Sequence, residues 1–268
     1  MPDIPAENAS QGYYLGSRLL QLLAPNEGQI TVEVPVSLDI NDRAEKNGIN
    51  SYEVILKQTR DALVILEKEN PERIITLGGD CSASIVPFTY LASKYPGNLA
   101  IVWIDAHPDI NMPHDNYKGY HAMALTACLG LWDDEITRSL PAKLEASKSL
   151  VVGIREWDEG MQERQHELKI KGLPPKEVAD NSHAVMEWLK TTGASKVVIH
   201  YDLDVLDPKE IIAAVGVVPD GMKISEVSRL ISDIGKEYDI VGLTVAEPMP
   251  RTAIKLRNML NELPLLKN

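Results

Sequence analysis

Residues 99–109 read LAIVWIDAHPD, an uninterrupted apolar run that passes directly into two aspartates and a histidine. Apolar residues without polar alternation are typical of a parallel strand covered on both faces. Residues 196–204, KVVIHYDLD, repeat the pattern and end in Asp202 and Asp204. Ligands of open parallel sheets collect outside the carboxyl ends of the strands. The two stretches therefore predict an α/β protein with a polar site at one edge of its sheet.

Short β-branched runs alternate with longer helical patterns along the whole chain. The predicted strands are Ile30–Val34, Arg73–Leu77, Leu99–Ile104, Leu150–Ile154, Lys196–Tyr201 and Asp239–Val245. The predicted helices are Tyr52–Asn70, Ser82–Lys94, Asn181–Thr192, Ile224–Lys236 and Thr252–Leu263. We expect Ser51 to cap the first helix and Pro71 to end it. This alternation predicts one domain over residues 1–268, with a mostly parallel sheet and helices on both faces.

The composition limits the classes of partner and the compartment. The 268 residues are 44% hydrophobic, and 27 Lys and Arg against 39 Asp and Glu give a net charge of −12. This balance argues against nucleic acid and anionic membranes as partners, because both need a basic surface. Only Cys81 and Cys128 occur, no basic and apolar leader is visible, and no apolar run reaches the roughly 20 residues of a membrane span. We expect a cytoplasmic protein.

The two acidic strand ends together suggest a metal site. In an extended chain Asp105, His107 and Asp109 would share one face, as would Asp202 and Asp204. Four neighbouring carboxylates repel one another, and divalent cations such as Mn²⁺, which accept carboxylate and imidazole ligands, remove that repulsion. The alternative is that these aspartates only cap helices and shape turns. Their occurrence after two separate buried strands favours the metal.

Two further strand ends lead to the same edge. Residues 78–84 read GGDCSAS, in which two glycines allow a sharp turn and Asp80 or Ser82 can cap the next helix. Cys81 then lies at the edge that carries the aspartates. Residues 245–248, VAEP, present a single carboxylate, Glu247, after the last strand. Either signal alone is weak, but both add to the predicted site.

Four segments together resemble the arginase (ureohydrolase) family. They are GGDCS at 78–82, DAHPD at 105–109, DLDVLDP at 202–208 and the glutamate of VAEP at 247. Their order is similar to that of an arginase-like bacterial sub-branch with GGDCS in place of GGDHS. The resemblance implies a three-layer α/β/α fold of the arginase/deacetylase type and a binuclear manganese centre. The implied metal ligands are Cys81, Asp105, His107, Asp109, Asp202 and Asp204, with Asp105 and Asp202 bridging the two ions.

Cys81 is the main departure from the family motif, which has histidine at this position. A thiolate favours Zn²⁺ or iron over Mn²⁺, whereas a thiol whose pKa is raised by neighbouring carboxylates does not ligate. Three outcomes for metal binding remain open: two ions with an altered metal preference, a first site that binds weakly, or a single ion. Cys81 could also simply fill space at the start of a helix.

The resemblance further implies a hydrolase of linear amidines, in which a metal-bridged hydroxide attacks a guanidino or amidino carbon. His121, which matches after a one-residue gap, would protonate the leaving amine, with His114 as its competitor. Asp109 would orient the hydroxide, and Glu247 would hold the cationic group of a small substrate. Asn111 and Asp158 match residues that bind the far end of the substrate. Arginine, agmatine, guanidinobutyrate and formiminoglutamate are all candidates, and a homo-oligomer is implied.

Two other functions compete with this hypothesis. The first is a degenerate family member that binds metal weakly, or binds one ion, and serves a regulatory or interaction role. Cys81 and the altered substrate loops favour it, whereas the retained ligands, His121 and Glu247 favour the enzyme. The second is a nucleotide-binding α/β protein, which is disfavoured because the chain has neither a GxGxxG nor a GxxxxGK[ST] loop.

Overall fold

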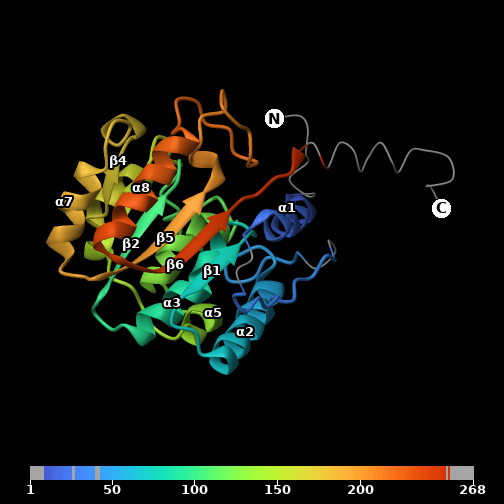
Figure 1. Cartoon of the computed structure of the whole chain (residues 1–268). Helices are drawn as coiled ribbons and strands as arrows, with labels where there is room; N and C mark the ends of the chain where they lie inside the picture. Colours follow the sequence, from blue (N-terminus) through green and yellow to red (C-terminus); the bar gives the residue numbers. More distant parts are fainter. Residues whose placement is uncertain (1–8, 26–27, 40–42, 252, 254–268) are drawn as a thin grey trace, which may run out of the picture.

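The computed structural model describes residues 9–25, 28–39, 43–251 and 253. These residues form a six-stranded sheet in the order β1–β6–β5–β2–β3–β4, and every neighbouring pair is parallel (Figure 1). The strands are β1 (Ile74–Leu77), β2 (Leu99–Ile104), β3 (Ser149–Val152), β4 (Lys171–Leu173), β5 (Lys196–Asp202) and β6 (Asp239–Ala246). The predicted parallel sheet is therefore confirmed.

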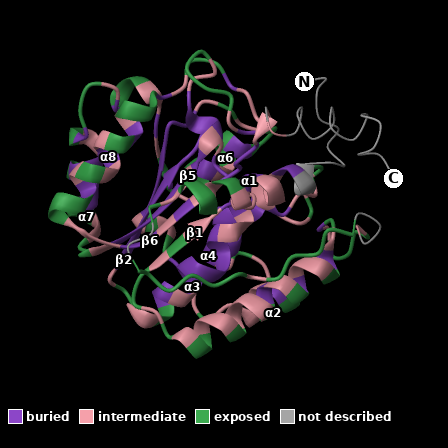
Figure 2. Cartoon of the chain, turned by 45° about the vertical axis from the view of Figure 1, so that its right-hand side comes forward, coloured by how far each residue is buried: buried purple, intermediate pink, exposed green. Residues whose placement is uncertain are grey.

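Helices cover both faces of this sheet. They are α1 (Ala9–Leu23), α2 (Tyr52–Glu69), α3 (Ile85–Lys94), α4 (Ala124–Leu129), α5 (Glu135–Ser139), α6 (Met161–Glu167), α7 (His183–Thr192) and α8 (Ile224–Glu237). Ile101 and Trp103 of β2 pack into one buried cluster with α3 and α4, while Val102 and Ile104 pack into another with α7 and α8. Figure 2 shows the strands buried between these layers. The three-layer α/β/α fold is confirmed.

The predicted strand Ile30–Val34 is wrong. Residues 28–39 form no regular structure, and Ile30 is 81% exposed. A β-branched run becomes a strand only where a neighbouring strand accepts its hydrogen bonds, and this segment has no such neighbour in the sheet. The sheet ends instead at β1, whose Ile75 is 66% exposed. The sixth strand is β4, three residues that pair with β3.

The other predicted helices and strands that the structure describes differ from the predictions mainly at their ends. The expected Ser51 cap is wrong, because Ser51 adopts a left-handed conformation with φ 59° and its side chain makes no capping hydrogen bond. The predicted helix Ser82–Lys94 begins as a 3-10 helix, η2 (Cys81–Ser84), before α3. Helices α1, α4, α5 and α6 and strand β4 were not predicted. The predicted helix Thr252–Leu263, apart from Ala253, lies outside the described residues.

The sheet brings the acidic segments together. Strands β2 and β5 are neighbours in register, with Ile104 opposite Tyr201, so Asp105 and Asp202 emerge side by side. Strand β6 lies on the other side of β5 and carries Glu247 just beyond its end. These carboxyl ends point toward α1 (Figure 1). None of the described helices has the length and apolar character needed to cross a membrane.

Candidate metal centre

Three overlapping groups of potential ligands occupy this edge of the sheet, and the third group consists of Cys81, Asp202 and Glu247. The inner cluster comprises Cys81, Asp105, Asp109 and His200, and the outer cluster comprises Asp105, His107 and Asp204. Within each cluster one ligand atom per residue lies within 4.8 Å of every other. All members of the inner cluster are buried, whereas the His107 side chain is 33% exposed. Asp105 belongs to both, as expected for a carboxylate between two ions.

The outer cluster is organised around His107. The His107 Nδ1 atom lies 2.9 Å from Asp204 Oδ2 and 3.5 Å from Asp105 Oδ1. On the other side of the ring, His107 Nε2 lies 3.2 Å from Glu156 Oε2. A proton on Nε2 would be donated to Glu156 and would leave Nδ1 with a free electron pair facing the carboxylates, which is the orientation of a metal ligand.

A turn after β2 separates Asp109 from Asp105 and His107. Asp109 adopts a left-handed backbone conformation with φ 49°, and its carbonyl accepts a hydrogen bond from the Leu125 amide at 3.0 Å. The expectation that all three residues share one strand face is therefore wrong, because the chain stops being extended at Asp105. The turn nevertheless directs Asp109 to the inner cluster, and its Oδ2 atom is buried without a hydrogen-bond partner.

The end of β5 is held by hydrogen bonds to the backbone. Asp202 Oδ1 accepts the Asp204 amide at 2.7 Å, and Asp204 Oδ1 accepts the Ala106 amide at 3.2 Å. The Arg155 guanidinium donates to four carbonyl oxygens, those of Gly153, Asp204, Val218 and Pro219, at 2.9 to 3.0 Å. Arg155 thus ties the end of β3 to the segments that follow β5, although it contacts no carboxylate of the clusters directly.

Cys81 is the first residue of η2 and also belongs to the third group, with Asp202 and Glu247. Asp80 caps η2 by accepting the Ser82 amide at 3.0 Å, as predicted. The Cys81 thiol donates to Asp202 Oδ2 at 3.1 Å and lies 3.7 Å from Glu247 Oε1. Glu247 is also in a left-handed conformation, with φ 58°, and its amide donates to the Gly79 carbonyl at 2.8 Å. The structure therefore brings the ends of β1, β5 and β6 together around the thiol.

The protonation of these groups reflects crowding in a buried site. Burial, followed by the charges of neighbouring carboxylates, raises the pKa of Asp109, Asp202 and Asp204 above the usual range. Burial also raises the pKa of Glu247 to about 8 and that of the Cys81 thiol well above its ordinary value. A divalent cation among these groups would stabilise their charged forms.

The donor set fits divalent metal ions. Two atoms of the inner cluster, Asp109 Oδ2 and His200 Nε2, are buried and have no hydrogen-bond partner. Buried polar atoms without partners are costly, and an ion at this place would satisfy both. Carboxylate oxygens and imidazole nitrogens suit Mn²⁺, Fe²⁺ and Zn²⁺, while the Cys81 thiolate would favour the softer ions.

The predicted proton donor and its competitor lie in different surroundings. His121 Nε2 is 3.0 Å from the Tyr117 hydroxyl, and the two rings meet edge to face. Burial, and then the charge of Glu247, raises the pKa of Tyr117 to about 12. The His114 side chain is 73% exposed and lies 3.9 Å from Asp115. The geometry thus favours His121 over His114.

Asn111 and Asp158, which were predicted to bind the far end of the substrate, also contact each other. Asn111 Nδ2 donates to Asp158 Oδ2 at 3.3 Å, and the Asn111 amide donates to the Ala122 carbonyl at 2.9 Å. Asn111 is buried, whereas Asp158 is exposed. The pair therefore links the segment after β2 to the segment after β3 at the rim of the acidic edge.

A sequence profile described as the arginase family matches residues 17–259. The chain belongs to the arginase family. This arginase-family chain is 30% identical over 205 residues to an N(omega)-hydroxy-L-arginine amidinohydrolase of Streptomyces lavendulae, covering 74% of the chain and 71% of that protein. It is 26% identical over 236 residues to an arginase of Entamoeba histolytica, covering 82% and 75% respectively. The predicted family and the predicted hydrolase class are confirmed.

Solved arginase structures share the fold of this arginase-family chain. The arginase of Bacillus caldovelox superposes with a TM-score of 0.70 at 21% identity, covering 87% of this chain and 84% of that one. The Entamoeba histolytica arginase in complex with L-ornithine gives a TM-score of 0.68 at 23% identity, with 77% and 73% covered. At this level of identity, the superpositions support the fold alone.

Two residues at the arginase-type site were not predicted from the sequence. His200 lies inside β5, two residues before Asp202, so both side chains point to the same side of the strand. A histidine within an otherwise buried apolar run was the available signal. Tyr13 of α1 is the second, because burial and the nearby Glu247 carboxylate raise the pKa of its phenol. Its position depends on how α1 packs, which the sequence does not indicate.

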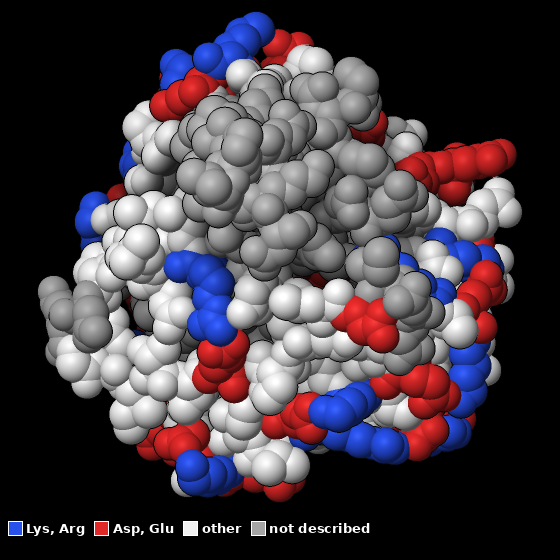
Figure 3. All heavy atoms as spheres, turned by 90° about the vertical axis from the view of Figure 1, so that its right-hand side faces the viewer, with Lys and Arg blue, Asp and Glu red and all other residues white. Residues whose placement is uncertain are grey.

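Several acidic side chains on the surface of this family member are paired with basic ones, unlike the carboxylates at the carboxyl ends of the strands. On the side that carries α1, basic and acidic side chains lie next to one another along the lower border (Figure 3). The structure pairs Lys46 with Glu53 and Lys57 with Asp61 on or near α2. These surface acids have cationic partners, in contrast to the carboxylates of the inner cluster.

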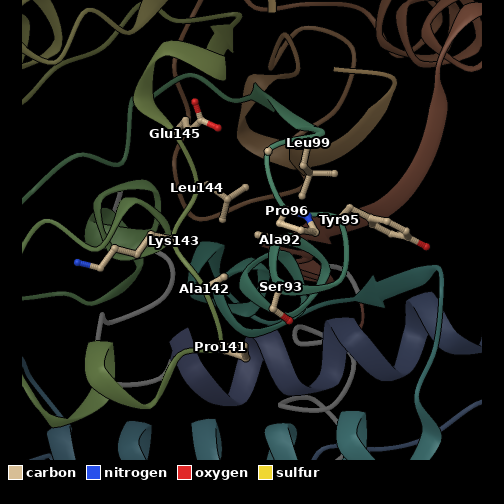
Figure 4. Close-up of a pocket in the computed structure, with 11 residues that line it drawn as sticks. Ala92, Ser93, Tyr95, Pro96, Leu99, Pro141, Ala142, Lys143, Leu144 and Glu145 are labelled. Carbon is tan, nitrogen blue, oxygen red and sulfur yellow. The ribbon is translucent and has the colours of Figure 1, made fainter. Parts of the chain in front are cut away.

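A separate cavity of about 330 Å³ lies near the amino-terminal end of β2. Leu99, Tyr95, Leu144 and Glu145 contribute to its lining (Figure 4). Leu99 is the first residue of β2, whereas Asp105 follows its last residue, so the cavity is at the opposite edge of the sheet. None of the residues of the two clusters lines it.

Proposed function

We propose that the chain hydrolyses a guanidino C–N bond in a small cationic substrate such as arginine or a close relative. The observation that carries this proposal is Glu247, a buried carboxylate 3.7 Å from the Cys81 thiol and therefore at the inner cluster. A fixed carboxylate in a partly dry site pairs well with a guanidinium group and orients it. In this position Glu247 would place the guanidinium carbon next to the metal ligands.

The ligands in this proposal are Cys81, Asp105, His107, Asp109, Asp202 and Asp204. Five of them lie in the inner and outer clusters, which share Asp105, and Asp202 lies beside Cys81 in the third group. This arrangement supports two ion positions rather than one. Divalent ions held there would lower the pKa of water and so supply a strong nucleophile near neutral pH. Manganese is the expected metal, and zinc or iron are the alternatives because of Cys81.

The residues around the clusters would handle the protons. Asp109 has an unpartnered buried oxygen that could accept a hydrogen bond from the attacking water. His121 would donate a proton to the departing amine, because a guanidinium carbon releases its nitrogen only as a neutral amine. The Tyr117 hydroxyl, 3.0 Å from His121 Nε2, would hold the ring in position.

The far end of the substrate would meet Asn111 and Asp158. An amide beside a carboxylate suits a zwitterionic amino acid, since the amide can donate to its carboxylate and Asp158 can pair with its ammonium group. The relatives named for arginine and N-hydroxy-arginine support such a substrate. Agmatine and guanidinobutyrate each lack one of the two charged groups, and formiminoglutamate has an amidino group instead.

The test is turnover of a substrate panel by protein of known metal content. Metal-free protein would be loaded with Mn²⁺, Zn²⁺ or Fe²⁺, and urea or amine release would be measured with all four candidates. Glu247→Gln should raise KM for guanidino substrates, while the exposed Glu159→Gln should behave as wild type. Binding of ions without turnover of any substrate would instead support the degenerate alternative. A cytoplasmic location and a homo-oligomer stay predictions from the sequence.

A further inference from the structure

His200 is held rigidly in the wall of the inner cluster. It is fully buried in β5, and its ring stacks on Trp103 with centroids 3.7 Å apart and planes at 13°. The two residues are register partners across the β2–β5 pair, so the sheet itself sets the stack. The imidazole plane is therefore fixed before any ligand binds.

The two ring nitrogens of His200 have different surroundings. Nδ1 lies 2.8 Å from the Ser84 hydroxyl oxygen in η2. Nε2 faces Asp105 Oδ2 at 3.6 Å and Asp202 Oδ2 at 3.9 Å, which is beyond hydrogen-bond length, and it has no other partner. One nitrogen is thus satisfied, and the other is aimed at the carboxylates without contacting them.

This arrangement is unfavourable for a residue that serves only packing. A buried N–H on Nε2 would be an unsatisfied donor, which costs free energy without compensation. If Nδ1 donates its proton to Ser84 instead, Nε2 carries a free electron pair directed at the centre of the inner cluster. A histidine whose second nitrogen is fixed by a hydrogen bond is the usual form of an imidazole metal ligand.

We propose that His200 Nε2 supplies the nitrogen ligand of the ion in the inner cluster, together with Cys81, Asp105 and Asp109. Position 81 is cysteine in this chain, whereas the resembling motif has histidine there, so the imidazole comes from β5 instead. One thiolate, one imidazole and two carboxylates form a set that favours Zn²⁺ over Mn²⁺. The inference refines the metal centre on which the proposed function rests.

Co²⁺ binding to metal-free protein tests the assignment without relying on activity. Wild type should bind about two ions per chain, and the ion bound by Cys81 should give a near-ultraviolet thiolate-to-Co²⁺ charge-transfer band. His200→Gln should lose one ion and the band together. His107→Gln should lose one ion but keep the band, because His107 belongs to the outer cluster. The exposed His114→Gln is the control and should match wild type.

A second variant covers the case in which His200→Gln fails to fold. Ser84→Ala leaves the imidazole in place but removes the partner of Nδ1, and should weaken inner-cluster binding by about 10- to 100-fold. In competition, wild type should take Zn²⁺ in preference to Mn²⁺ at the position that gives the band, and Cys81→His with His200→Ser should reverse this order.

Retention of two ions and an unchanged band in His200→Gln would overturn the inference and leave the proposed function intact. If that variant does not fold, unchanged affinity in Ser84→Ala would do the same. If wild type binds no metal at all, both the inference and the proposed function fail. If wild type binds two ions without the band, Cys81 is no ligand and the inner set proposed here is wrong.

Discussion

The inner and outer clusters share Asp105 but differ in chemistry and in exposure. The outer cluster offers only oxygen and nitrogen atoms, and the side chain of its histidine is 33% exposed. The inner cluster is completely buried and contains a thiol. The outer residues all follow the ends of β2 and β5, whereas the inner set also draws on η2 and on the interior of β5.

This difference shows how one half of a site can change while the other half stays the same. Cys81 and His200 belong to the inner cluster but not to the outer one, so they can be exchanged without removing a ligand of the outer cluster. The shared residue, Asp105, is held by the Trp103 indole at 2.9 Å and the His107 amide at 2.7 Å. The predictions below separate the contributions of the two halves, starting with the largest effect.

Asp204→Asn should abolish activity. The change removes a charged ligand from the outer cluster and the partner of His107 Nδ1, which lies 2.9 Å away. We expect loss of one ion and a fall in kcat/KM of about 1,000-fold or more, measured by elemental analysis and by initial rates.

Asp207→Asn provides the matched control for this change. Asp207 lies in the same motif but belongs to neither cluster, and its side chain accepts the Lys209 amide. This variant should keep both ions. Full activity in Asp204→Asn with one ion missing would mean that the inner cluster works alone, and the proposed pair of ions would then be wrong.

His121→Asn should reduce kcat without changing the metal content. His121 belongs to neither cluster and contacts Tyr117, so its loss removes the proton donor but no ligand. The expected decrease is about 100-fold or more at neutral pH. His114→Asn should be indistinguishable from wild type. A loss of metal in His121→Asn would show that a ligand has been mistaken for an acid.

The metal-free protein should become less stable as the pH rises. The pKa of Glu247 is raised to about 8 by burial, so the folded state retains a proton that the unfolded chain releases near its ordinary carboxyl pKa. The stability from this protonated form is complete below the unfolded pKa and is lost as the pH rises through about 8.

The measurement is the Tm of chelator-treated protein, which should be lower at about pH 9 than at about pH 5 by several degrees. Glu247→Gln should flatten part of this decline, because the amide cannot ionise. Added Zn²⁺ should also reduce it, since a bound ion compensates the carboxylates. An unchanged pH profile in Glu247→Gln would show that this carboxyl group titrates normally.

Asp115→Asn should have the smallest effect. Asp115 pairs in bidentate fashion with Arg164, which also donates to the Ile110 carbonyl at 3.0 Å, and the pair anchors the segment between Asn111 and His121. The hydrogen bond from Arg164 lowers the pKa of Asp115, so its stability contribution is present above the unfolded pKa and is lost in acid.

At pH 7 we expect the free energy of unfolding of Asp115→Asn to fall by about 1 kcal/mol. Denaturant unfolding at pH 7 and near pH 3 measures the effect, which should disappear at the lower pH because the wild-type carboxyl is then protonated. Metal stoichiometry should stay at the wild-type value. A loss of either ion would mean that this loop supports a cluster directly.

Much of the fold could be predicted because the strands in the middle of the sheet carry strong local signals. Strand β2 has the predicted bounds, and β5 and β6 differ by one residue at their ends. Their apolar runs are buried whatever the neighbouring segments do. By contrast, the run Ile30–Val34 has equally β-branched residues but forms no strand. Whether such a run forms a strand depends on a neighbouring strand that can pair with it, and the sequence does not reveal which strands are neighbours.

The predictions for the site divided in the same way, between residues with a strong local signal and residues whose role depends on distant contacts. Residues at the carboxyl ends of buried strands, such as Asp105 and Asp202, were predictable because strand ends meet at one edge. His200 was hidden within a strand, and only its spacing from Asp202 and its register with Trp103 give it a role at the site. Tyr13 reaches Glu247 through the packing of α1. Contacts between distant segments therefore account for what the sequence did not reveal.

The left-handed backbone of Asp109 and Glu247 also bears on how this chain can evolve. Asparagine, glycine and histidine tolerate this conformation, and each is one base change from aspartate in the genetic code. Glycine and aspartate are likewise one base change from glutamate. A single mutation at either position can therefore remove the carboxylate while the chain keeps its path. Descendants of this gene could lose activity with the fold intact, and asparagine or glycine at position 109 or glycine at position 247 would identify them.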